Sequence, residues 1–184
     1  KIFQRKINFF GNLKFFLDIN IIEKKQKNIC FASIHKSEFD KILEIINNLD
    51  MEKINNIYII PRHIQYVRNL KSILNESFYN KVIVHEEFGS TLPIFDKSKL
   101  VFMGGSLIPH GGQNPLEALS RGCYILTGQY NDNFRSQYLE LNDQNLASIV
   151  RGNIKEISLK INQLLDLNFD NSDLIKNYFN ENTK

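Results

Sequence analysis

The chain has 184 residues, and its 23 Lys and Arg against 20 Asp and Glu give a formal net charge of +3. So small an excess argues against a dedicated nucleic-acid binder, which would concentrate positive charge, and no nucleic-acid partner is expected. The hydrophobic fraction of 42%, with 14 Phe, favours a packed globule over a disordered chain. No apolar run approaches the roughly 20 residues that a membrane-spanning helix needs.

Short apolar runs alternate with helical patterns along the chain. Strands are expected over 28–33, 57–60, 81–85, 100–103 and 124–127, and helices over 37–48, 63–74, 114–120, 154–167 and 172–180. In the first helical pattern Ser37 and Asp40 resemble a capping pair, and Pro115 fits the first turn of a later helix. Strands joined by helices predict an α/β fold with a parallel sheet covered on both faces.

The two cysteines, Cys30 and Cys123, each lie inside an apolar run. We interpret both as small buried hydrophobic residues of a reducing compartment. A cysteine-based zinc site lacks its ligands, so no metal is expected. The chain begins with Lys1 and not Met, which suggests a piece of a longer protein.

In parallel α/β sheets, ligands bind at the carboxyl ends of the strands. Ser33 and His35 follow the first expected strand, where an ordinary N-cap turn is the alternative. Pro61 and Arg62 follow the second, and Arg suits an anion through its planar fork unless it pairs with a surface carboxylate. Phe88, Gly89 and Ser90 follow the third expected strand. Gly89 either lets the backbone come close to a ligand or belongs to a plain turn.

The fourth segment, residues 104–117, reads GGSLIPHGGQNPLE. Its two glycine pairs frame a loop that leads into a helix, whose free N–H groups and dipole favour an anion. Asn114 stands at the expected N-cap, and Glu117 has the spacing of a capping box. Alternatively, the Glu117 carboxylate accepts hydrogen bonds from a sugar. The loop matches neither a Walker sequence nor the GxGxxG spacing.

This loop closely resembles the GGSLxxxGGHNPLE signature of the 3-deoxy-D-manno-octulosonic acid (Kdo) transferases of lipopolysaccharide synthesis. Shorter segments resemble that family in the same order along residues 11–134. They are GNLKF at 11–15, ASIH at 32–35 for the family's ASTH, PRH at 61–63, Gly128, and Asn133 with Phe134.

The resemblance implies the C-terminal lobe of a glycosyltransferase B architecture, a Rossmann-like parallel sheet flanked by helices. Residues 1–184 would form this single lobe, with 1–10 as an inter-lobe segment and 168–184 as a C-terminal helix or tail. The family transfers Kdo from CMP-Kdo to a lipid A precursor at the cytoplasmic face of the bacterial inner membrane. Its general base is a Glu in an N-terminal acceptor lobe that this chain lacks, so the chain alone is expected to be inactive.

The resemblance also implies site residues. Lys14 matches a residue thought to stabilise the transition state. Contacts to CMP are expected from Pro61, Arg62, Phe88, Gly89, Ser90, Asn114, Pro115, Leu116 and Glu117. Contacts to the donor sugar or within the loop are expected from Ser33, His35, Gly104, Gly105, Ser106, Gly111, Gly112 and Gln113. No cofactor or metal is implied beyond the donor, and the full-length protein would meet the acceptor and the membrane surface through its other lobe.

Several residues depart from the family pattern: Gln113 replaces His, Ile34 replaces Thr, and Phe88 and Ser90 replace Met and Glu. Ile64 and the residues after it also depart from the family's PRHPER. They leave two alternatives open. One is a lobe of another nucleotide-sugar glycosyltransferase of the same architecture. The other is a degenerate lobe that serves as a non-catalytic interaction module.

Overall fold

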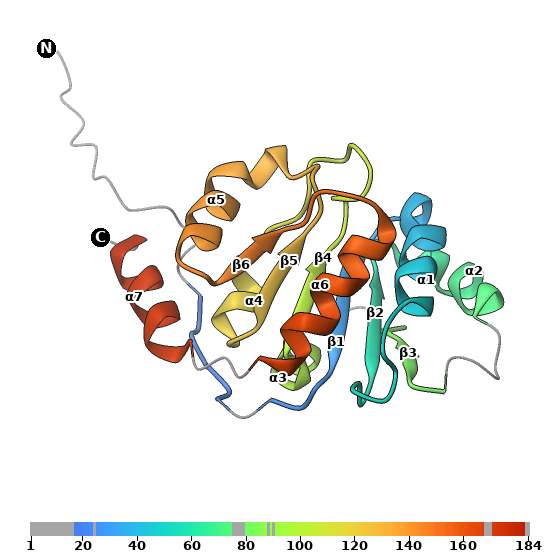
Figure 1. The fold of residues 1–184 in the computed structure, drawn as a ribbon, viewed down its shortest axis with the longest axis horizontal. Helices are drawn as coiled ribbons and strands as arrows, with labels where there is room; N and C mark the ends of the chain where they lie inside the picture. Colours follow the sequence, from blue (N-terminus) through green and yellow to red (C-terminus); the bar gives the residue numbers. More distant parts are fainter. Residues whose placement is uncertain are drawn as a thin grey trace, which may run out of the picture.

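Six parallel strands form one sheet in the order β3-β2-β1-β4-β5-β6 (Figure 1). The computed structural model describes residues 17–23, 25–74, 80–87, 89, 91–167 and 171–182. The strands are β1 (Ile29–Ile34), β2 (Ile57–Pro61), β3 (Val82–Val84), β4 (Leu100–Met103), β5 (Tyr124–Thr127) and β6 (Ala147–Ile149). The direction in which successive strands are added reverses at β1, so β1 and β4 flank the point where a parallel sheet of this kind opens a crevice.

The five expected strands are confirmed to within two residues at each end. Every residue of β4 and β5 is buried, as expected for central strands covered on both faces. The sixth strand, β6, was not predicted, because its three residues are too few to show a pattern.

Three helices cover one face of the sheet: α1 (Phe39–Asn47), α2 (Val67–Ile73) and α6 (Ile154–Asp166). Figure 1 shows α6 running across this face, with α1 beside it. Their apolar stripes meet Phe31 and Phe102, whose ring centroids lie 5.8 Å apart in the middle of the sheet. The short 3-10 helices η2 (Lys36–Glu38) and η3 (Ile64–Tyr66) lead into α1 and α2.

Four helices cover the opposite face: α3 (Leu92–Lys97), α4 (Leu116–Ser120), α5 (Arg135–Asp143) and α7 (Ser172–Asn182). The 3-10 helix η4 (Asp132–Phe134) precedes α5. The side chains of Tyr138, Tyr178 and Phe179 are almost fully buried there. The extended segment from Leu17 to Ile22 packs on the same cluster, with the Asn20 N–H donating to the Ser120 carbonyl at 3.1 Å.

Two expected capping arrangements are wrong. The capping box belongs to η2, where His35 is the N-cap and its backbone N–H donates to the Glu38 carboxylate at 3.0 Å, and not to a Ser37–Asp40 pair. Helix α4 begins at Leu116 with Pro115 at its N-cap, so Asn114 and Glu117 form no capping box. The Asn114 side chain accepts the Leu116 N–H at 3.1 Å instead, because proline has no N–H to offer at the position between them.

Both cysteines are free and buried, as expected. Burial raises the pKa of the Cys30 thiol well above its usual range and that of Cys123 to about 11, so both are inert at neutral pH. Within the described part of the chain, no helix combines the length and the apolar character that crossing a membrane requires.

Candidate functional site

A cavity of about 390 Å³ opens at the carboxyl ends of β1, β2 and β4. It lies where the strand order reverses, the position at which open parallel sheets bind ligands. Six of the sequence-predicted residues line it: Ser33, Arg62, Gly89, Gln113, Asn114 and Glu117. Its walls also include residues that were not predicted, namely Ala32, Met103, Thr91, and Leu92 and Phe95 of α3.

Arg62 follows β2 directly and is held by its backbone, since its N–H donates to the Ile34 carbonyl at 2.8 Å. Its side chain is exposed at the cavity. Among the described residues, Arg62 forms no ion pair with a carboxylate. Within that part of the chain, a surface salt bridge therefore does not account for the position of this arginine. A guanidinium without a carboxylate partner at a cavity wall suits a phosphate.

The end of β1 is distorted where it meets the glycine loop. Ser33 has a φ of +56°, in the left-handed region, and the pairing of β1 with β2 shifts there. Gly104 lies against it, and a Cβ at position 104 would come within 2.4 Å of the Ser33 carbonyl oxygen. Only glycine permits this approach, and strained backbone of this kind concentrates at functional sites.

The fully buried carboxylate of Glu38 binds the glycine loop. Its Oε2 accepts the N–H groups of His35 at 3.0 Å and Gly105 at 2.7 Å, and its Oε1 accepts those of Ser106 at 3.1 Å and Leu107 at 3.0 Å. The N–H groups of residues 105–107 are therefore occupied by Glu38 and are not open to a ligand. Sequence reasoning missed Glu38, although its position three residues after His35 was a signal.

Ser106 is also committed to structure. Its hydroxyl donates to the Met103 carbonyl at 2.6 Å and accepts the Gly128 N–H at 2.8 Å. Farther along, the Gly112 N–H donates to the Gly105 carbonyl at 2.9 Å, and Gly111 has a φ of +80°. The residues Gly104, Gly105, Ser106, Gly111 and Gly112 thus shape the loop, while Gln113 is the loop residue that lines the cavity.

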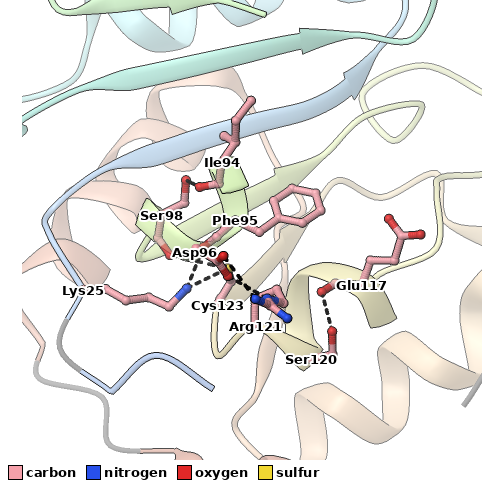
Figure 2. Close-up of polar contacts among 9 residues, drawn as sticks. All are labelled: Lys25, Ile94, Phe95, Asp96, Ser98, Glu117, Ser120, Arg121 and Cys123. Atoms are coloured by element: carbon pink, nitrogen blue, oxygen red, sulfur yellow. Dashed lines mark hydrogen bonds and ion pairs between the residues drawn. The ribbon is translucent and has the colours of Figure 1, made fainter. Parts of the chain in front are cut away.

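Of the predicted segment at α4, Asn114 and Glu117 line the cavity, whereas Pro115 and Leu116 are buried. Figure 2 shows the Glu117 carboxylate directed away from the polar contacts at the other end of the helix, where the Ser120 hydroxyl donates to the Glu117 carbonyl at 2.8 Å. The carboxylate is exposed, and it provides an acceptor for ligand hydroxyl or amino groups.

The two cavity walls α3 and α4 are joined by a bidentate ion pair (Figure 2). Arg121 donates from Nε to Asp96 Oδ1 at 2.6 Å and from an Nη to Oδ2 at 3.1 Å, with its side chain only 8% exposed. Lys25 adds a bond to the Phe95 carbonyl at 2.6 Å. Sequence reasoning missed this pair, because nothing in the spacing of the two residues relates them.

Beside the cavity, two histidines gather around His35. The ring of His110 stacks on that of His35 with centroids 4.4 Å apart, and His63 meets it edge-on at 6.2 Å. Burial, followed by the nearby His110, lowers the pKa of His35. His35 was predicted as a site residue, but His63 and His110 were not, since only the fold brings them together.

Three expected site residues, Lys14, Phe88 and Ser90, lie outside the described residues. Pro61 ends β2 and is half-buried, but it does not line the cavity. In the described ranges no three His, Cys, Asp or Glu side chains are grouped so that they could hold a metal ion.

No protein-family model matches the chain. The chain is, however, similar in sequence to several curated proteins. The chain is 29% identical over 161 residues to a 3-deoxy-D-manno-octulosonic acid transferase of Haemophilus influenzae, a match that covers 71% of this chain and 37% of that protein. It is 26% identical over 170 residues to the enzyme of the same name from Aquifex aeolicus, covering 85% of this chain and 47% of the relative. The chain therefore spans less than half the length of these relatives.

The fold has a close match among solved structures. The C-terminal CMP-Kdo binding domain of WaaA from Acinetobacter baumannii superposes with a TM-score of 0.68 at 19% identity, covering 86% of this chain and 89% of that domain. This match confirms the expected fold class, a lobe of the glycosyltransferase B architecture. The chain is a homologue of the Kdo transferases, and it has the fold of their C-terminal domain.

Proposed function

We propose that the chain is the donor-binding half of a glycosyltransferase that transfers Kdo from CMP-Kdo to a lipid A precursor in lipopolysaccharide biosynthesis. One observation carries the proposal. Three segments that resemble the CMP contacts of the family, represented by Arg62, Gly89, and Asn114 with Glu117, meet around a single cavity. The spacing of these residues along the sequence does not place them together. They line one cavity because the strand order brings the ends of their strands side by side.

The cavity fits the chemistry of this donor. Departure of CMP develops negative charge on its phosphate, and the Arg62 guanidinium stabilises an anion there by charge-assisted hydrogen bonds. Asn114 and Glu117 offer an amide and a carboxylate to the hydroxyl and amino groups of the nucleoside. We assign to Lys14 a further stabilising charge during transfer. Because fixed cations suffice for this role, the site needs no metal.

The remaining parts of the reaction belong to a second lobe. The acceptor lipid, the base that activates its hydroxyl, and contact with the cytoplasmic face of the inner membrane are assigned to that lobe from the sequence resemblance to the Kdo transferase family. The chain alone then binds the donor without turning it over.

Calorimetric titration of the chain with CMP tests the proposal. Replacing Arg62 with Ala is expected to weaken CMP binding about tenfold or more, since a charged hydrogen bond contributes about 1.5–3 kcal/mol. Arg135→Ala is the matched control, because Arg135 is exposed, pairs only with Asp132 at 3.6 Å among the described residues, and does not line the cavity. An unchanged affinity for Arg62→Ala would remove that residue from the site.

A panel of nucleotides distinguishes the alternatives. CMP is expected to bind more tightly than UMP or UDP. Tighter binding of UDP would favour another glycosyltransferase of the same architecture, and binding of no nucleotide would favour an interaction module.

A further inference from the structure

The second half of the glycine loop is held by the chain segment that follows β5. The Asn133 N–H donates to the Gly111 carbonyl at 3.0 Å, and the Asn133 side chain donates to the His110 carbonyl at 3.3 Å. A Cβ at position 111 would come within 2.3 Å of the Asn133 amide nitrogen, so the two segments are in close contact. The bonds of Glu38 to the loop end at Leu107. A different part of the chain therefore places residues 110–113.

Tyr138 of α5 adds a contact from this segment to a residue of the cavity. Its hydroxyl donates to the Gln113 carbonyl at 2.8 Å. The Tyr138 side chain is fully buried, and burial raises the pKa of its phenol well above the usual range, so the hydroxyl stays a donor at neutral pH. Helix α4 starts too late to bond this carbonyl, since the Leu119 N–H already donates to Pro115. Among the described residues, the phenol is thus the one donor to the Gln113 carbonyl.

The peptide that Tyr138 holds joins two residues that line the cavity, Gln113 and Asn114. Because a peptide group is planar, fixing its carbonyl also fixes the direction in which the chain enters Asn114. On the other side, Pro115 restricts the backbone of the residue before it. The Asn114 Oδ1 accepts the Leu116 N–H at 3.1 Å, which leaves the NH2 group of this side chain to a ligand. The placement of that NH2 group therefore depends on the bond from Tyr138.

We propose that Tyr138 is a positioning residue for nucleotide binding, which acts through the Gln113–Asn114 peptide. Tyr138 does not line the cavity itself, so it acts without touching the ligand. The inference rests on the proposed function, which places CMP in this cavity. The segments that resemble the Kdo transferases do not include Tyr138, so the resemblance assigns it no role.

Removing one oxygen atom tests the proposal. Tyr138→Phe keeps the buried ring and deletes the donor to Gln113. In a calorimetric titration with CMP, this variant is expected to bind about three- to tenfold more weakly, because the Asn114 amide is no longer held in place. Tyr178→Phe is the matched control. Tyr178 is also almost fully buried on this face of the sheet, but its hydroxyl lies 3.5 Å from the Glu140 carboxylate and not beside the loop. The control is expected to keep its CMP affinity within about twofold.

A double-mutant cycle separates positioning from a general loosening of the fold. In a chain that already carries Asn114→Ala, Tyr138→Phe is expected to change the CMP affinity by less than about twofold, because the group that it positions is gone. In a chain that carries Arg62→Ala, Tyr138→Phe is expected to keep its full effect, since Arg62 follows β2 and does not depend on the Gln113 carbonyl. Equal effects in the two backgrounds would overturn the proposal, because a loosened cavity weakens binding whichever contact remains.

The unmodified chain provides a test that does not depend on the folding of a variant. Coupling between two sites is reciprocal, so a bond that favours CMP binding must itself be favoured by bound CMP. Exchange of tyrosine hydroxyl protons with D2O is followed by NMR in a chain labelled with 13C at tyrosine Cζ. Saturating CMP is expected to slow this exchange at Tyr138 about three- to tenfold more than at Tyr178. Equal slowing at the two hydroxyls would contradict the proposal.

Failure of the inference can be told apart from failure of the proposed function. If CMP does not bind the unmodified chain, the proposed function is wrong and the inference falls with it. If CMP binds but Tyr138→Phe keeps the affinity, the proposed function stands and Tyr138 has no positioning role. If Tyr138→Phe and Tyr178→Phe weaken CMP equally, the loss reflects the removal of any buried hydroxyl, which also overturns the inference.

Discussion

Glu38 is the residue on which the shape of the glycine loop depends. Its side chain is fully buried, and the four N–H groups that it accepts come from the end of β1 and from three consecutive loop residues. A carboxylate with this many donors needs no cation beside it, because the N–H dipoles replace its hydration. Glu38 therefore does for this loop what a bound anion does in other glycine-rich loops.

Replacing Glu38 with Gln tests this role. The amide keeps the shape but presents an NH2 group to two N–H donors, which are left buried and unpaired. The free energy of unfolding is expected to fall by about 2–5 kcal/mol, since each such donor costs about 1–3 kcal/mol. Urea denaturation followed by circular dichroism measures the change. Asp40→Asn, an exposed carboxylate two residues away, is expected to stay within about 0.5 kcal/mol of the unmodified chain.

At the residue scale, the sequence predicted the glycines that the backbone of the loop requires better than it predicted the hydrogen-bonded and stacked side chains. Gly104 and Gly128 were chosen from their motifs, and the structure gives the reason: a Cβ there would come within 2.4 Å of the Ser33 oxygen or 2.3 Å of the Ser106 oxygen. Glu38 and His110 were missed, because burial and stacking depend on chain segments that only the folded sheet brings together.

At the scale of elements, the cavity depends on how α3 and α4 are held against each other. The two helices are short, with six and five residues, so their own hydrogen bonds contribute little stability. The Arg121–Asp96 pair joins them, and α3 supplies Leu92 and Phe95 to the cavity wall while α4 supplies Glu117. Hydrogen bonding to Asp96 raises the pKa of Arg121, in keeping with a tight pair.

Breaking this pair is expected to loosen the cavity. Asp96→Asn leaves the Arg121 guanidinium without its carboxylate in a buried position, and should lower the free energy of unfolding by about 1–3 kcal/mol. CMP affinity should fall along with it. Asp132→Asn removes a comparable pair with Arg135 whose side chains are 69% and 65% exposed, and should change stability by less than about 1 kcal/mol. Equal urea midpoints for the two variants would show that the Arg121–Asp96 pair does not stabilise this wall.

The elements that escaped sequence reasoning share a physical cause. Helix α3 and strand β6 have six and three residues, too few to show a period. Helix α5 buries only Tyr138 and Leu141 of its nine residues, so its apolar stripe is narrow. The central strands and α6 were found because their burial is continuous or strongly periodic. The sequence therefore predicted the central strands of the sheet, but it did not predict α3, which supplies Leu92 and Phe95 to the cavity wall.

At the scale of the whole molecule, the strand order is consistent with the proposed binding of an anionic donor by a chain of net charge +3. The reversal between β1 and β4 brings the ends of three strands to one place, where the Arg62 side chain lines the cavity. A cation placed by topology, here Arg62, gives a local positive potential that overall composition does not reveal.

From the same placement we predict that CMP binding is independent of metal ions. CMP at about 100 times its dissociation constant is expected to stabilise the chain by about 2.7 kcal/mol, which raises the midpoint of thermal unfolding by about 5–10 °C for a domain of this size. Scanning fluorimetry should give the same shift with and without EDTA, because Arg62 and neighbouring side chains supply the charge that a metal would otherwise provide. A shift that EDTA removes and added Mg²⁺ restores would show that the donor binds with a metal ion, and would require ligands from residues outside those that line the cavity.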